Sequence, residues 1–337
     1  MKYKYILFFI ILLTACQKER EVSTVFYYWK TVYKQNKVEN QYQNQLHSKQ
    51  LYVRIMDVDL DINLKAIPVA PINFAEHLPK QLEIVPVVFI VNKVLKDQKD
   101  VDLKQLASKI TTYVNAKVKQ AGKVDFKELQ IDCDWTATTR DQYFVLLQEI
   151  KMLTKGKILS ATLRLHQLKN QSKSGIPPVD KVLLMCYNMG NLRKSGVQNS
   201  ILDVDELKKY AGKNLGFYPM DIDIALPLFS WSVVFRNNQY AGISKRVSLS
   251  NLKNIKMFNS QNDGLYVAKL DLPSFGLIKN DIIRYEESKY EDIEKAAEYL
   301  STYLPKKPIN LIYYHLDQKL LKNYEINQLE KIATVLH

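Results

Sequence analysis

The chain has 337 residues, of which 47% are hydrophobic, and it carries a formal net charge of +13. This length fits one large α/β domain or two small ones, and the apolar content is sufficient for a core. The lysines are spread along the chain without a dense run, and the chain has 10 glycines. The composition therefore argues against a nucleic-acid partner and against a glycine-rich nucleotide loop.

Residues 1–15 have the pattern of a secretory signal peptide. Two lysines precede the apolar run Ile6–Leu13, which is shorter than the roughly 20 residues needed to span a bilayer. The next residues, Leu13-Thr14-Ala15-Cys16, resemble a bacterial lipobox, in which the cysteine is acylated and becomes the first residue of the mature chain. We therefore expect lipidation of Cys16 and a tether over residues 16–23. Gln17 after the cysteine favours the outer membrane, if the cell is Gram-negative.

Strand-like and helix-like segments alternate along the rest of the chain. Strands are predicted from short β-branched or aromatic runs, and helices from periodic apolar positions in longer polar stretches. The predicted strands are Val25–Lys30, Gln50–Val58, Ile84–Val91, Glu128–Trp135, Ile158–Leu165, Lys181–Asn188, Ile222–Phe229 and Ile309–His315. The predicted helices are Lys34–Ser48, Val101–Gln120, Asp141–Leu153, one that begins at Asp205–Tyr210, Tyr290–Tyr303 and Ile326–Leu336.

Eight strand–helix units favour a parallel sheet closed into a (β/α)8 TIM barrel. We assign residues 24–337 to a single barrel domain, with insertions at 59–80 after the second strand and 232–288 after the seventh. An open doubly wound sheet is the alternative. Cys133 and Cys186 each lie between two inward-facing strand residues, so we expect both to be buried free thiols beneath the helices.

Polar and aromatic side chains gather where the predicted strands end. A barrel places its site at these ends. The strongest signal is Ile131-Asp132-Cys133-Asp134, because alternation turns Asp132 and Asp134 to the same inward face. Two carboxylates held close together push one pKa upward, which suits acid–base chemistry. The other predicted site residues are Trp29, Asp57, Asp59, Gln130, Trp135, Arg164, Tyr187, Asn188, Trp231, Arg284, Glu286 and His315.

Two of these segments resemble the chitinase-like glycoside hydrolases of family 18. That family carries Asp-Gly-x-Asp-x-Asp-x-Glu after strand four and Met-x-Tyr-Asp or Asn after strand six. Here the segments are Leu129-Gln130-Ile131-Asp132-Cys133-Asp134-Trp135-Thr136 and Met185-Cys186-Tyr187-Asn188. The resemblance implies that Asp134 polarises a substrate acetamido group and that Tyr187 hydrogen-bonds its carbonyl. The general acid of the motif is replaced by Thr136. The chain also resembles a poorly characterised family of bacterial lipoproteins with a hydrolase-like barrel.

Three functions remain open at this point. A glycoside hydrolase would pair Asp132 or Asp134 with another carboxylate, for which the candidates are Asp57, Asp59 and Glu286. A non-catalytic glycan-binding protein would use Trp29, Trp135, Trp231 and Tyr187 as stacking surfaces. A scaffold within an envelope complex would use neither set. In each case we expect a monomer without a cofactor. No metal site is expected, because the five scattered histidines lack metal-ligand spacing.

Overall fold

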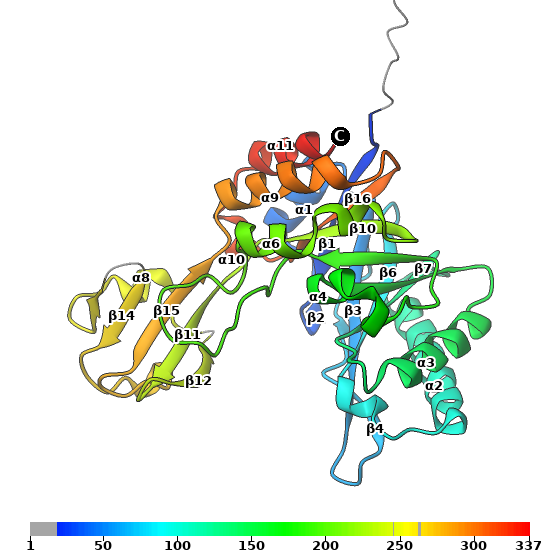
Figure 1. Ribbon diagram of the computed structural model, residues 1–337, viewed down its shortest axis with the longest axis horizontal. Coiled ribbons are helices and arrows are strands. Elements are labelled where there is room, and N and C mark those ends of the chain that lie inside the picture. Colours follow the sequence, from blue (N-terminus) through cyan, green and yellow to red (C-terminus); the bar gives the residue numbers. More distant parts are fainter. Residues whose placement is uncertain (1–18, 245, 262–263) are drawn as a thin grey trace, which may run out of the picture.

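The computed structural model describes residues 19–244, 246–261 and 264–337. The predicted signal peptide, residues 1–15, and Cys16 lie outside the described residues. Eight parallel strands form a closed barrel, with helices around it (Figure 1). The predicted (β/α)8 fold is therefore confirmed.

The barrel strands follow the order β1-β16-β10-β9-β8-β7-β6-β3, and pairing of β1 with β3 closes the ring. Every pair in this ring is parallel. The barrel strands are β1 (Val22–Tyr28), β3 (Gln50–Leu60), β6 (Glu83–Ile90), β7 (Glu128–Cys133), β8 (Ile158–Arg164), β9 (Lys181–Met185), β10 (Asp221–Pro227) and β16 (Ile309–Tyr314).

The helices cover the barrel through their apolar faces. In α2, Leu103, Ile110, Val114 and Val118 are buried at helical spacing, and each large apolar side chain contributes roughly 1.5–3 kcal/mol by leaving water. The helices are α1 (Lys37–Gln45), α2 (Asp100–Gln120), α3 (Arg140–Leu153), α4 (Leu165–Lys169), α5 (Gln171–Ser174), α6 (Val204–Tyr210), α7 (Gly212–Gly216), α8 (Leu249–Leu252), α9 (Tyr290–Tyr303), α10 (Gln318–Leu321) and α11 (Ile326–Leu336), with 3-10 turns η1 (Asn92–Leu95) and η2 (Pro273–Phe275).

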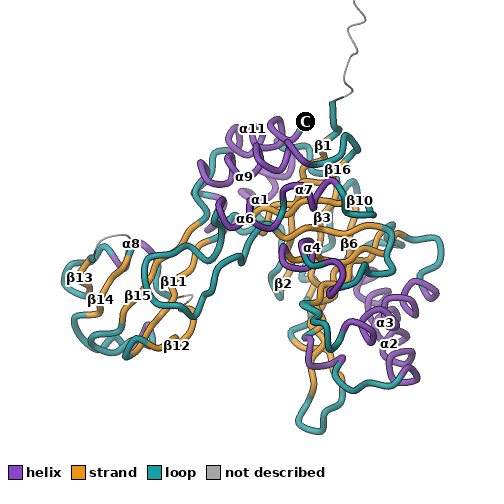
Figure 2. The backbone as a smooth tube through the Cα atoms, in the orientation of Figure 1, coloured by secondary structure: helices purple, strands orange, loops and turns teal. Residues whose placement is uncertain are grey.

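The chain between β10 and α9 forms a separate sheet that projects from the barrel (Figures 1 and 2). We call this sheet, residues 230–287, the insertion lobe. Its antiparallel strands are β11 (Ser230–Arg236), β12 (Gln239–Ser244), β13 (Phe258–Ser260), β14 (Leu265–Ala268) and β15 (Ile282–Glu287). The lobe has its own apolar cluster, in which Phe258 and Ile283 are buried. None of these five strands was predicted from the sequence.

The shorter insertion extends one barrel strand. Strand β3 continues past the ring and pairs with β4 (Ala66–Val69) in an antiparallel hairpin. A two-stranded pairing of β2 (Val32–Tyr33) with β5 (Asn73–Phe74) lies beside it. The hairpin extends away from the end of the barrel at which β1 begins (Figure 1).

The start and the end of the described chain are joined by Arg20. Its side chain is 1% exposed, and its guanidinium donates to the carbonyl oxygens of Leu304 (2.7 Å), Pro305 (2.9 Å) and Leu336. Its backbone N–H donates to the carbonyl of His337. Carbonyls at helix C-termini lack partners within the helix, so Arg20 satisfies the ends of α9 and α11 at once.

Several strands end earlier than the sequence predicted. Strand β7 ends at Cys133 instead of Trp135, and β9 ends at Met185 instead of Asn188. Asn188 has a positive φ of 56°, which is incompatible with a continuing strand. Cys133 and Cys186 are buried free thiols, as predicted, and burial raises the pKa of both thiols.

Candidate functional site

Strand β7 carries the residues around which the site is built. Its side chains alternate between two environments. Leu129, Ile131 and Cys133 are completely buried, and the carbonyl of Ile131 accepts from the hydroxyl of Tyr143 on α3 at 3.2 Å. The intervening polar side chains therefore face the barrel interior.

Asp132 is a carboxyl group held in an environment that disfavours its charge. It is 8% exposed, and its Oδ1 accepts a hydrogen bond from the Thr162 hydroxyl at 2.6 Å. Burial raises its pKa to about 7, and the charges of Asp134 and Asp57 act in the same direction. The Thr162 hydrogen bond and the Arg164 guanidinium oppose this rise. Near neutral pH, Asp132 can therefore either give or accept a proton.

The two nearby carboxylates each have an arginine partner. Asp134 binds the Arg164 guanidinium at 2.6 Å, with both side chains partly exposed. Asp57 accepts two hydrogen bonds from Arg54, at 2.6 and 2.7 Å. A two-bond fork of this kind fixes the orientation of the carboxylate. The site thus combines a buried carboxyl whose pKa is raised with two carboxylates that each pair with an arginine.

Aromatic rings form a continuous band across this end of the barrel. The Tyr314 ring lies 5.5 Å from that of Trp29, 5.2 Å from that of Tyr187 and 5.6 Å from that of Phe229. The Phe229 ring lies 5.2 Å from that of Trp231. These residues come from the ends of β1, β9, β10 and β16 and from the start of β11. Trp29, Trp231 and Tyr314 retain partial exposure, so the band offers apolar surface to a ligand.

The remaining predicted residues on the barrel lie around this core of the site. Gln130 accepts from the Tyr27 hydroxyl below Asp132. The backbone carbonyl of Asn188 accepts from Arg164 at 3.2 Å. The His315 ring lies 5.3 Å from the ring of Tyr314. A hollow of about 260 Å³ opens between the ends of β8 and β9, and Arg164, Tyr187 and Asn188 contribute to its lining.

Two of the predicted residues on the barrel, Trp135 and Asp59, have side chains that point away from Asp132. Trp135 is 1% exposed, its indole donates to the carbonyl of Ser174 at 2.9 Å, and its ring stacks on Tyr143. Alternation after Asp134 sends this side chain outward beneath α3, so it is not a stacking surface for a ligand. Asp59 pairs with Lys93 on η1 at 2.9 Å. The charges that shift the pKa of Asp132 are those of Asp134, Arg164 and Asp57, and Asp59 is not among them.

Arg284 and Glu286 form a buried ion pair in the insertion lobe. Their side chains are each 1% exposed and are joined at 2.6 Å. Arg284 also donates to the carbonyls of Lys194 and Gly196. The carboxylate of Glu286 accepts from the Ser200 backbone and from the Trp231 indole, at 2.8 and 2.9 Å. The pair therefore holds the loop after β9 and orients Trp231, and its carboxylate is fully engaged.

Sequence reasoning missed Arg54, Thr162 and Tyr314. Thr162 lies on β8, where the alternation that turns Ser160 inward also turns Thr162 inward. The same rule, applied to Asn310 in β16, selects Tyr314 instead of its neighbour His315. The position of Arg54 could not be predicted by alternation, because the register of β3 against β6 shifts between Arg54 and Met56. A bulge of this kind re-aims side chains.

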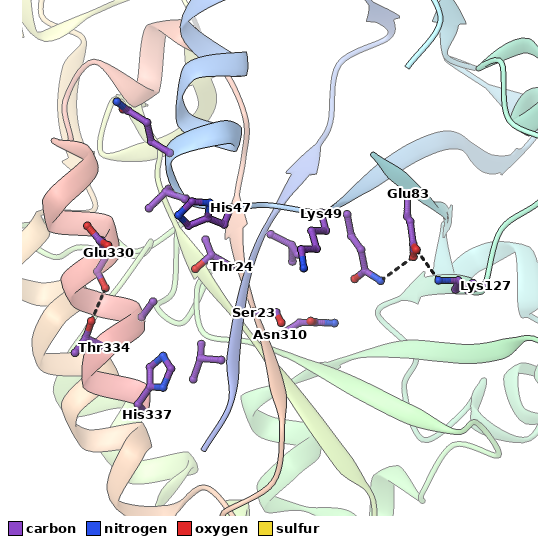
Figure 3. Close-up of a pocket in the computed structure, with 16 residues that line it drawn as sticks. Ser23, Thr24, His47, Lys49, Glu83, Lys127, Asn310, Glu330, Thr334 and His337 are labelled. Atoms are coloured by element: carbon purple, nitrogen blue, oxygen red, sulfur yellow. Dashed lines mark hydrogen bonds and ion pairs between the residues drawn. The ribbon is translucent and has the colours of Figure 1, made fainter. Parts of the chain in front are cut away.

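The opposite end of the barrel interior contains a compensated charge cluster. Lys181 binds Glu128 and Asp223, each at 2.8 Å. Glu128 also accepts from Ser160 at 2.6 Å, and Asp223 accepts from the Asn310 backbone at 2.7 Å. Two wider hollows, of about 590 and 650 Å³, open at this end. The first is shown in Figure 3, with Glu83 paired to Lys127 at its edge. Neither hollow contains an acid–base set comparable to that around Asp132.

Within the described parts of the chain, no group of three or more His, Cys, Asp or Glu residues is placed to hold a metal ion. None of the helices in those parts combines the length and the apolar character needed to cross a membrane.

No protein-family model and no curated protein sequence matches the chain. Solved structures do. A chitinase from Bacteroides thetaiotaomicron aligns with a TM-score of 0.53 at 11% identity, covering 94% of this chain and 97% of the other. The C-terminal domain of a putative chitinase from Desulfitobacterium hafniense aligns with a TM-score of 0.51 at 9% identity, covering 94% and 98%.

The spore cortex-lytic enzyme SleL of Bacillus cereus aligns with a TM-score of 0.50 at 13% identity, covering 94% of this chain and 75% of the other. Identities this low establish architecture and leave activity open. The architecture agrees with the resemblance carried by Asp132, Asp134 and Tyr187. The chain therefore has the (β/α)8 barrel fold of the chitinase-like glycoside hydrolases.

Proposed function

We propose that this protein is a lipid-anchored envelope protein that cleaves glycans at a site built on Asp132 and Asp134. The observation that carries the proposal is the environment of Asp132. A buried carboxyl with a pKa of about 7 lies beside two arginine-paired carboxylates. Pairs of acidic groups in such contrasting environments divide the roles of acid and base between them.

Asp132 would serve as the proton donor in this mechanism. Cleavage of a glycosidic bond needs an acid that protonates the leaving oxygen and a carboxylate that attacks, activates water or stabilises the positive charge on the sugar. A group with a pKa of about 7 retains a proton at neutral pH and releases it when the oxygen becomes basic. Asp57 or Asp134 would supply the second carboxylate.

The resemblance to family 18 suggests how the sugar is oriented. Asp134 would polarise an acetamido group, and the Tyr187 hydroxyl would bind its carbonyl oxygen. Trp29 and Trp231, at the two ends of the aromatic band, would stack against neighbouring sugar rings. A polysaccharide that contains N-acetylated sugars is therefore the substrate class to test first. The named functions of the structural neighbours, two chitinases and a cortex-lytic enzyme, agree with this choice.

Glycan binding without cleavage is the second candidate. It is favoured by Thr136, which occupies the position of the family's general acid. Its hydroxyl lies 2.9 Å from that of Thr138, in an exposed turn before α3. A hydroxyl cannot protonate a glycosidic oxygen effectively, because its pKa is far above neutral. In this case the aromatic band and Asp134 would retain the glycan, and Asp132 would contribute a hydrogen bond.

A panel of glycans, screened for both binding and product release, distinguishes the two candidates. The soluble chain beginning at Glu19 should release product from an N-acetylated polymer. Asp132→Asn should reduce the rate by about 10²- to 10⁴-fold, the usual contribution of a general acid, while circular dichroism remains unchanged. Glu83→Gln is the matched control, because Glu83 pairs with Lys127 at the other end of the barrel.

Each outcome supports one function. Product that disappears in Asp132→Asn supports hydrolysis. Saturable affinity without product supports the binding protein, and Asp134→Asn should then weaken the affinity. If neither product nor affinity is found across the panel, both candidates fail, and a scaffold role recovered by pulldown of a protein partner takes their place.

The lipid anchor is proposed from the Cys16 motif and is tested separately. Metabolic labelling with a fatty acid should mark the full-length protein and should leave the Cys16→Ser variant unlabelled. Fractionation should place the wild type in the membrane fraction, with the outer membrane expected in a Gram-negative cell. Labelling of the Ser variant at the wild-type level would overturn the anchor.

A further inference from the structure

We propose that the end of the barrel at which the strands begin faces the membrane, so that Asp132 is reached from the aqueous side. We call this end the N-terminal face; it consists of the loops that precede the barrel strands. The inference rests on the proposed anchor at Cys16. The structural observation that carries it is the burial of Arg20.

Arg20 fixes the point at which the tether meets the barrel. Its side chain is 1% exposed and is bonded to the carbonyls of Leu304, Pro305 and Leu336. Residue 20 therefore cannot swing away from α9 and α11 to lengthen the tether. Four residue steps separate it from Cys16, and a fully extended chain covers about 14 Å over that number. An acyl group at Cys16 thus holds Arg20, at the edge of the N-terminal face, within about 14 Å of the lipid surface.

The site lies at the other end of the same strands. Strand β1 begins at Val22, next to Arg20, and ends at Tyr28, next to Trp29 of the aromatic band. Its 7 residues correspond to roughly 20 Å along a strand. Figure 1 shows β1 beginning at one end of the barrel, the β3–β4 hairpin extending from the other end, and the insertion lobe, which follows the end of β10, projecting to the side. A glycan therefore has to reach Asp132 from the aqueous side, well above the lipid headgroups.

The composition of the N-terminal face suits a bilayer surface. Val124 and Phe217 lie in loops before β7 and β10 and are 97% and 78% exposed. Lys49, Lys80 and Lys155 lie in loops before β3, β6 and β8, are exposed, and form no ion pair with another described residue. A surface that presents both exposed lysines and exposed apolar side chains binds the interface of membranes that contain anionic lipid. The hollow in Figure 3 opens on this face, with Lys49, His47 and His337 at its wall.

Fluorescence quenching in vesicles tests this orientation. The lipidated protein is reconstituted into vesicles of phosphatidylcholine and phosphatidylglycerol that contain spin-labelled lipid. A bimane label is attached at Val124→Cys or Phe217→Cys on the N-terminal face. The matched controls are Ile62→Cys in the β3–β4 hairpin and Ile255→Cys in the insertion lobe, which are 96% and 78% exposed. Cys133 and Cys186 are buried and should not react with the label.

The lipid should quench the labels at Val124→Cys and Phe217→Cys at least about 3-fold more strongly than those at the control positions. Equal quenching at all four positions, or stronger quenching at Ile62→Cys, overturns the orientation. Flotation of the same vesicles reports separately on the anchor. Failure to float overturns the anchor and the orientation together, whereas flotation with equal quenching overturns the orientation alone.

A longer tether provides a second, independent test. About 20 Gly/Ser residues inserted between Glu19 and Arg20 add a flexible segment with an end-to-end distance of roughly 25 Å. The protein should still float, but the difference in quenching between the two sets of labels should decrease. A difference that persists unchanged would show that the short tether does not set the orientation.

Discussion

Buried acidic groups have different charge partners at the two ends of the barrel interior. Glu128 and Asp132 lie on the same strand, face the same interior and are 3% and 8% exposed. Glu128 meets a lysine at 2.8 Å and the hydroxyls of Ser160 and Tyr52. Asp132 has the Thr162 hydroxyl as its hydrogen-bond donor, and the charges of two further carboxylates act on it.

Glu128 and Asp132 therefore differ in how far their charges are compensated, although they lie on one strand. A buried charge with a close counter-ion and filled hydrogen bonds is stable and unreactive, whereas one without full compensation retains its proton. The cluster around Lys181 therefore compensates the buried charges at the base of the barrel, whereas the environment of Asp132 at the top raises its pKa to about 7.

The largest loss of unfolding free energy is expected from a substitution in the Lys181 cluster, at the base of the barrel. Lys181→Met leaves Glu128 and Asp223 buried without their shared cation, and removal of one partner from a buried charge cluster costs about 3–5 kcal/mol. Urea unfolding at neutral pH should show this loss of unfolding free energy. Lys151→Met is the control, because the Lys151–Asp180 pair is well exposed and should contribute less than about 1 kcal/mol. Equal effects of the two substitutions would contradict the structural role of the cluster.

At the other end of the barrel, Asp132 should make the unfolding free energy depend on pH. The folded protein retains the Asp132 proton up to a pKa of about 7, whereas the unfolded chain releases it near pH 4. The contribution of Asp132 to the unfolding free energy should therefore be fully present below pH 4 and should be lost as the pH rises to 7, by up to ~4 kcal/mol at 1.36 kcal/mol per pH unit. Asp132→Asn should remove this decline. Asp59→Asn, at an exposed pair, should leave it in place, and an unchanged decline in Asp132→Asn would exclude Asp132 as its source.

The smallest effect should come from Thr162→Val. This substitution keeps the shape of the side chain but removes the hydroxyl that bonds Asp132 at 2.6 Å and lowers its pKa. The pKa should rise further, by an amount worth about 1 kcal/mol, the usual net value of one hydrogen bond. Carboxyl ¹³C NMR of Asp132 measures it directly. Thr111→Val, in α2, is the matched control, because that hydroxyl bonds helix carbonyls; a shift of the Asp132 pKa in this variant would point to an indirect cause.

The barrel could be predicted from the sequence because its strands and helices leave a periodic pattern of apolar residues. Eight short apolar runs separated by helical stretches restrict the chain to few topologies. The placement of Asp132 and Asp134 on one inward face followed from strand alternation alone. The same rule, applied to Trp135, turns its side chain outward. Trp135 was nevertheless predicted to be a stacking surface, and the structure buries it against Tyr143.

The rest of the site depends on backbone features that the local sequence pattern does not indicate. Arg54 reaches Asp57 because of a shift in register that no local pattern encodes. Glu286 was proposed as a second carboxylate from its place in a polar run, yet it is neutralised by Arg284 two residues earlier. Pairing of this kind depends on β15, a strand that was not predicted from the sequence.

The ring of bonds around Arg20 also has a consequence for the order of folding. Its side chain joins residues that lie at least 281 positions apart in the chain, and contacts of such separation form late, because a long loop must close first. The bonds that join Arg20 to the ends of α9 and α11 therefore cannot form until both helices have been synthesised. Under the proposed export, these bonds would form only after α11 has crossed the membrane.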